Sequence, residues 1–95
     1  MSKAALESAS RQLAVELAPK SIAVNTIQAG VTDTPALRKI PGNENMIKRM
    51  EHINPNQRLT TPKDVAKVAL MIGKSYDTWM TGNTIRVDGG EDIVG

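Results

Sequence analysis

The stretch that decides the fold is IAVNTIQAGVTDTP, residues 22–35. Its first part, residues 22–27, is a β-branched run with apolar side chains in both registers, which predicts a short strand covered on both faces. The residues that follow, through Thr34, include Gly30 and predict a loop. Thr34 and Pro35 predict a helix start, because the hydroxyl caps the first turn and proline fits the first helical position.

Helices are predicted on both sides of this stretch. Residues 2–18 carry apolar side chains at spacings of three and four, which predicts an amphipathic helix that Pro19 stops. After the loop, a short helix should reach Lys39. A second helix, residues 44–53, should be capped by Asn43.

The carboxyl-terminal third predicts one more helix and one more strand. Residues 61–64, Thr-Pro-Lys-Asp, combine a capping hydroxyl, a first-turn proline and an acidic third residue, and Gly73 should end the helix that they begin. Residues 84–87 alternate as a strand with Ile85 and Val87 on one face. A glycine pair follows this strand and should end it.

This order of elements predicts an α/β fold with two parallel strands. Two parallel strands alone make a poor sheet, because both faces must be covered and both edges need partners. We therefore expect further chain or another subunit to complete the sheet.

Size and composition limit the classes of protein to consider. Ninety-five residues suffice for one small domain, which should bury roughly 60 to 65% of its unfolded surface. The net charge of +2 is too small to indicate a nucleic-acid partner. No cysteine is present, which excludes disulfides and thiolate metal sites. Apolar runs are too short to span a bilayer, so we expect no membrane partner and a cytoplasmic location.

Four segments together resemble the carboxyl-terminal part of the short-chain dehydrogenase/reductase family: residues 2–8, 24–27, 29–35 and 87–90. The resemblance implies the carboxyl-terminal portion of a Rossmann-like doubly wound parallel sheet. Residues 1–95 would form a partial domain that binds NAD or NADP and lacks the amino-terminal dinucleotide-binding half. Ala29, where most members carry proline, favours the enoyl-acyl-carrier-protein reductases of this superfamily.

The resemblance also implies site residues. Lys3 matches the catalytic lysine that contacts the cofactor ribose and lowers the pKa of a catalytic tyrosine four residues earlier, a position ahead of Met1. Gly30, Thr32 and Thr34 match the loop beside the nicotinamide ring. There, the Thr32 backbone would bind the carboxamide, Thr34 would contact the carboxamide or the pyrophosphate, and Gly30 would permit close backbone approach.

The implied function is that of a fragment of an NAD(P)(H)-dependent oxidoreductase, inactive alone. Its complete form would transfer hydride to or from a carbonyl, alcohol or enoyl-thioester substrate and would form a homo-oligomer. The alternative is a structural or oligomerisation module without catalysis. We give less weight to a helix-turn-helix binder around residues 55–61, and we expect Tyr76 to pack rather than to act as a substitute acid. His52 should be a surface residue, and no metal is expected.

Overall fold

The computed structural model describes residues 2–75 and 77–94, and Tyr76 therefore lies outside the described residues. Two strands, β1 and β2, pair in parallel with Thr26 opposite Thr84 and Ala29 opposite Val87. The elements in chain order are α1 (Lys3–Leu17), the 3-10 turn η1 (Ala18–Lys20), β1 (Thr26–Ala29), α2 (Pro35–Arg38), α3 (Asn43–Ile53), α4 (Pro62–Lys74), β2 (Thr84–Val87) and α5 (Glu91–Val94). The predicted α/β class with two parallel strands is confirmed.

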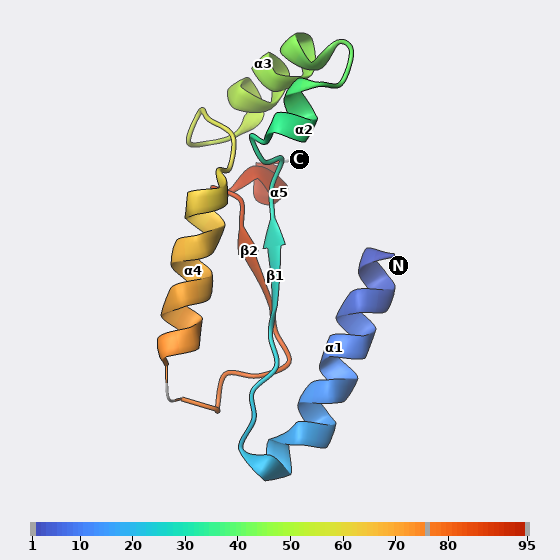
Figure 1. Cartoon of the computed structure of the whole chain (residues 1–95), viewed down its shortest axis with the longest axis vertical. Coiled ribbons are helices and arrows are strands. Elements are labelled where there is room, and N and C mark those ends of the chain that lie inside the picture. Colours follow the sequence, from blue (N-terminus) through green and yellow to red (C-terminus); the bar gives the residue numbers. More distant parts are fainter. Residues whose placement is uncertain (1, 76, 95) are drawn as a thin grey trace.

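The two strands lie between two long helices, with α4 on one side and α1 on the other (Figure 1). Helices α2 and α3 continue beyond the carboxyl ends of the strands, where α5 also lies. Helix α1 runs antiparallel to β1, so its amino terminus faces the same end of the sheet (Figure 1). All the loops that follow β1 and β2 are therefore gathered at one end of the molecule.

Capping side chains start three of the helices, and two of these caps, Thr34 and Thr61, are the ones that the sequence predicts. Ser2 accepts a hydrogen bond from the Ala5 N–H, and Thr34 accepts one from the Leu37 N–H. Thr61 and Asp64 form a complete capping box at α4. Local side-chain chemistry thus fixes the beginnings of α1, α2 and α4.

Some predicted boundaries are wrong. Helix α1 ends at Leu17, close to the predicted stop, and Pro19 lies in the 3-10 turn that follows. Gly73 does not end α4 but lies inside it, since this helix continues to Lys74. Asn43 does not cap α3. It is the first helical residue, and its side-chain amide donates to the Arg38 and Ile40 carbonyls at the end of the preceding helix.

The first strand is shifted relative to its prediction, from residues 22–27 to Thr26–Ala29. Its start is set by the partner strand, because the Thr26 N–H donates to the carbonyl of Asn83, the residue before β2. Asn25 is held separately, with its side-chain amide donating to the Met80 carbonyl at 2.8 Å. A strand boundary that depends on a segment far along the chain leaves no local signal.

The apolar interior is small. Among the described residues, the buried apolar side chains are Ala14, Ile47 and Leu59. The predicted apolar stripe of α1 is not the face that packs on the strands, because Leu6 and Leu13 are about half exposed while Ala14 is buried. Ser10, on the same side as Ala14, shares a hydrogen bond of 2.7 Å with Thr26 in β1.

Candidate functional site

The candidate site is the loop that follows β1, residues 30–34. Three of the four predicted site residues, Gly30, Thr32 and Thr34, lie in this loop. Ligands of open α/β sheets bind beyond the carboxyl ends of the strands, which is where the loop lies (Figure 1).

A single parallel bridge fastens the loop to the segment before α4. The Thr60 N–H donates to the Val31 carbonyl at 3.1 Å, and the Asp33 N–H donates to the Thr60 carbonyl at 2.8 Å. In such a bridge, the residue between the two bonded peptide groups directs its own N–H and carbonyl to the opposite side. Thr32 is that residue, and it therefore presents a donor and an acceptor away from Thr60.

The preceding peptide, between Gly30 and Val31, is held at both of its polar atoms. The Thr32 hydroxyl donates to the Gly30 carbonyl at 2.8 Å. The Val31 N–H donates to the Glu91 carboxylate at 3.1 and 3.3 Å. Both bonds fix the orientation of the backbone that leads into Thr32.

The structure gives a packing reason for glycine at position 30. A Cβ added at this position would lie 2.9 Å from the Asp88 Cβ and 3.0 Å from both the Glu91 Oε2 and the Thr60 Oγ1. The space that a side chain would take is thus filled by the protein itself. Close packing of the loop against Thr60 and the residues after β2 therefore requires a glycine here.

Thr34 serves as the N-cap of α2. Its hydroxyl oxygen accepts the Leu37 N–H at 3.2 Å, and a hydroxyl retains one proton to donate after accepting. The neighbouring Asp33 forms a two-bond ion pair with Arg38, at 2.9 and 3.0 Å. The guanidinium of Arg38 lowers the pKa of Asp33, so the loop carries a charged carboxylate next to Thr34.

Lys3 lies on a separate element. It is the first residue of α1, it is exposed, and it faces the same end of the sheet as the loop (Figure 1). Within residues 2–75 and 77–94, none of the hydrogen bonds joins Lys3 to residues 30–34. The structure therefore brings three predicted residues together and leaves the fourth apart.

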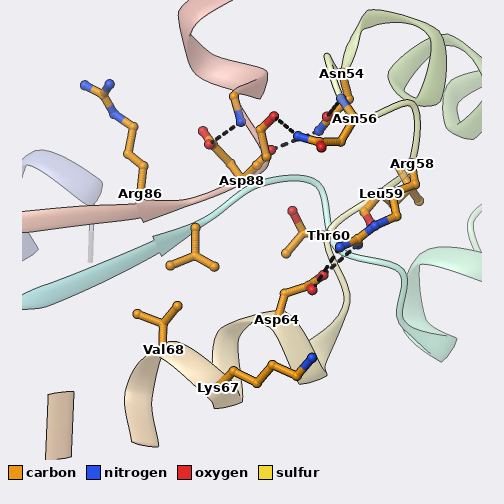
Figure 2. Close-up of a pocket in the computed structure, with 13 residues that line it drawn as sticks. Asn54, Asn56, Arg58, Leu59, Thr60, Asp64, Lys67, Val68, Arg86 and Asp88 are labelled. Carbon is orange, nitrogen blue, oxygen red and sulfur yellow. Dashed lines mark hydrogen bonds and ion pairs between the residues drawn. The ribbon is translucent and has the colours of Figure 1, made fainter. Parts of the chain in front are cut away.

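A pocket of about 420 Å³ lies beside the loop on the α4 side (Figure 2). None of the four predicted site residues lines it. Its polar wall is an ion pair in which Arg58 contacts Asp64 at 2.7 and 3.0 Å, and Figure 2 shows this pair opposite the Asn54 and Asn56 amides. The pocket shares Thr60 and Asp88 with the support of the loop, and is thus a neighbour of the predicted site.

The sequence analysis did not identify the residues that hold the turn after β2, against which the loop packs. Asn54 is 3% exposed and donates to the Asp88 carbonyl at 2.9 Å, and Asn56 donates to the Gly89 carbonyl at 2.6 Å. The Asn54 side chain also accepts the Asn56 N–H, the local turn that an Asn-Pro-Asn sequence favours. The Asn-Pro-Asn sequence could therefore have predicted the turn at residues 54–56. Nothing in the local sequence indicated that this turn contacts residues 88–89.

The position of His52 can also be compared with its prediction. His52 is exposed, as predicted. In α3, the buried residue is Ile47. Among the residues that the structure describes, no group of three His, Cys, Asp or Glu side chains is placed to hold a metal ion. No described helix is long and apolar enough to cross a membrane.

Comparison with known proteins identifies the family. The family model described as "Enoyl-(Acyl carrier protein) reductase" matches residues 1–91. The chain therefore belongs to the enoyl-(acyl carrier protein) reductase family of short-chain dehydrogenases/reductases.

Individual relatives agree with this assignment. The chain is 37% identical over 95 residues to "Enoyl-[acyl-carrier-protein] reductase [NADH] FabI" from Synechocystis, covering all of this chain and 37% of that protein. It is 36% identical over 89 residues to 7alpha-hydroxysteroid dehydrogenase from Escherichia coli, covering 94% of this chain and 34% of that one. The chain thus spans about a third of the length of these relatives.

A solved structure confirms the Rossmann-like fold. The Bacillus cereus enoyl-acyl carrier protein reductase, determined with NADP+ and indole naphthyridinone, superimposes with a TM-score of 0.85 and 31% identity. The match covers 98% of this chain and 36% of that chain. The two strands and their helices are therefore arranged as a portion of that larger fold.

Proposed function

We propose that this chain contributes the nicotinamide-facing loop of an NAD(P)(H)-dependent oxidoreductase. The reaction would be hydride transfer to or from a carbonyl, alcohol or enoyl-thioester substrate. The observation that carries this proposal is the clamped loop, in which Thr32 presents an N–H and a carbonyl on the side away from Thr60. Family membership supports the proposal, because one relative is a reductase whose name specifies NADH and another was solved with NADP+.

The exposed groups of Thr32 fit the chemistry of a nicotinamide. A primary carboxamide has one carbonyl acceptor and an NH₂ donor, so it can exchange two hydrogen bonds with the N–H and carbonyl of one residue. The remaining hydroxyl proton of Thr34 can donate to the carboxamide or to a phosphate oxygen. When bound, the nicotinamide supplies the hydride-transfer chemistry.

Lys3 would act through its charge. In the role that the resemblance implies, its ammonium group would contact the cofactor ribose and lower the pKa of a tyrosine, which favours the ionised phenol. That tyrosine would have to be supplied from outside these 95 residues. General acid catalysis needs the donor within hydrogen-bond reach of the substrate, so we expect the isolated chain to be inactive.

Binding and turnover assays on the purified chain test this proposal. NADH and NADPH, followed by cofactor fluorescence, should bind with a dissociation constant of about 1 mM, because a single loop supplies only a few kcal/mol. Incubation with carbonyl and enoyl substrates should give only background oxidation. Cofactor oxidation well above background would contradict the predicted inactivity, and a complete lack of binding would contradict the cofactor role.

The alternative function, an oligomerisation module, is favoured by one observation. Large apolar side chains on α1, α4 and the α4–β2 connection are exposed, including Leu13, Met71 and Trp79. Trp79 is 93% exposed. Exposed apolar surfaces of this kind mark interaction sites in soluble proteins.

A further inference from the structure

We infer that Glu91 is a positioning residue for the candidate nicotinamide loop. This inference rests on the proposed function, since it concerns the backbone that presents Thr32. Glu91 is the first residue of α5, a helix that the sequence did not predict. Its carboxylate reaches across sixty positions of the chain to accept the Val31 N–H.

The contact restrains the Gly30–Val31 peptide, which leads into Thr32. Among residues 2–75 and 77–94, the partner of the Gly30 carbonyl is the Thr32 hydroxyl, a side chain from the same loop. The N–H of this peptide is held by Glu91, which belongs to a different part of the chain. Rotation of this peptide would turn the Val31 backbone and alter the direction in which Thr32 presents its groups. Glu91 therefore joins this peptide to the turn after β2, in addition to the backbone bond from the Gly30 N–H to the Val87 carbonyl at 3.3 Å.

Glu91 is itself held in place. Asp88 is 8% exposed, and its carboxylate accepts the N–H groups of Gly90 at 3.0 Å and Asp92 at 3.2 Å. These bonds shape the turn after β2 and begin α5, so the backbone of Glu91 is fixed relative to the end of the strand. The Glu91 Oε2 would also lie 3.0 Å from a Cβ at position 30, which shows how closely it packs against Gly30.

The charge of Glu91 suits this task. A hydrogen bond from an amide to a carboxylate is roughly twice as strong as one between neutral groups. A glutamine at this position would keep an acceptor oxygen and lose the charge, whereas alanine would leave the Val31 N–H without a partner. The three side chains therefore predict a graded effect on the loop.

Amide hydrogen exchange, measured by NMR on the 95-residue chain without cofactor, tests the inference. In Glu91→Ala, protection of the Val31 N–H should fall about tenfold, the equivalent of one hydrogen bond of ~1.4 kcal/mol. In Glu91→Gln, much of that protection should return. The Thr60 N–H, which donates to the Val31 carbonyl, should keep its protection in both variants.

Asp92→Asn is the matched control. Asp92 lies next to Glu91 in α5, and its carboxylate contacts Arg86 at 3.2 Å rather than the loop, so this variant should leave Val31 protection unchanged. Unchanged Val31 protection in Glu91→Ala would overturn the inference. Equal loss at Val31 and Thr60 would also overturn it, because it would show a general structural role.

A second measurement separates this inference from the proposed function. Titration with nicotinamide mononucleotide should shift the Thr32 amide resonance in the wild-type chain and do so more weakly in Glu91→Ala. If wild type shows no shift, the cofactor role fails, and the exchange experiment still decides whether Glu91 orients the loop. If both proteins bind the ligand equally, positioning by Glu91 is contradicted.

Discussion

At the scale of single residues, Gly30 has no room for a side chain. The turn at Gly30 could be predicted from the local sequence, since a glycine between a strand and a capping threonine indicates a turn. The physical reason could not, because the atoms that exclude a Cβ belong to Thr60, Asp88 and Glu91. Glu91 could not be predicted for the same reason. Its contact with Val31 joins two distant segments, and neither segment carries a local sequence signal for it.

Gly30→Ala should destabilise the fold by about 1–3 kcal/mol, the usual cost of forcing extra atoms into a packed site. The measurement is the free energy of unfolding in urea. Gly73→Ala is the control, because Gly73 lies in α4 with nothing within 4 Å of an added Cβ. That variant should be more stable than wild type by up to about 1 kcal/mol. Equal stability of Gly30→Ala and wild type would contradict the close packing.

Asp64 should make stability depend on acid pH. Its pKa is lowered, first by the hydrogen bonds from Arg58 and then by the Thr61 N–H and hydroxyl. A carboxyl group with a lower pKa in the folded state stabilises the fold above its unfolded pKa, and this contribution is lost as the pH falls toward the folded pKa. The stability advantage of wild type over Asp64→Asn should thus be full at pH 7 and shrink below about pH 4. An advantage that does not change with pH would contradict this pairing.

At the scale of elements, the starts of helices were more predictable than their faces. Ser2, Thr34 and Thr61 act as caps through bonds to peptides three positions away, so local sequence contains the whole signal. The packed face of α1 and the start of β1 depend on distant partners, Gly82 beside Ala14 and Asn83 beside Thr26. Periodicity alone could not identify these partners.

Thr61→Ala should cost about 1 kcal/mol of stability, because the cap of α4 loses its hydroxyl. Urea unfolding monitored by circular dichroism measures the loss. Thr61→Ser keeps the hydroxyl and should recover most of it. If the alanine and serine variants were equally stable, the capping box that the structure shows at α4 would not contribute to folding.

At the scale of the whole molecule, the chain is extended and has a large surface for its length. The radius of gyration is 15.6 Å, whereas a compact domain of this length has about 12 Å. The accessible surface is 7028 Å², roughly a third more than the ~5,300 Å² of a compact protein of this mass. The large radius of gyration and the large accessible surface both agree with the expectation that a sheet of two parallel strands needs further protein to cover it.

We therefore expect the purified chain to self-associate. Exposed apolar side chains on several elements, among them Leu70, Met71 and Trp79, favour contact with another copy. Light scattering over a range of concentrations should give a mass above that of one chain and rising with concentration. A single species with the mass of one chain at high concentration would count against the oligomerisation module.

The most direct test of the nicotinamide loop is a ¹H–¹⁵N NMR titration of the wild-type chain with nicotinamide mononucleotide. The proposed role predicts the largest shifts at the amides of residues 30–34, with Thr32 foremost, and little change at Lys67 and Val68 in the neighbouring pocket. Shifts confined to that pocket, or no shifts at all, would contradict it.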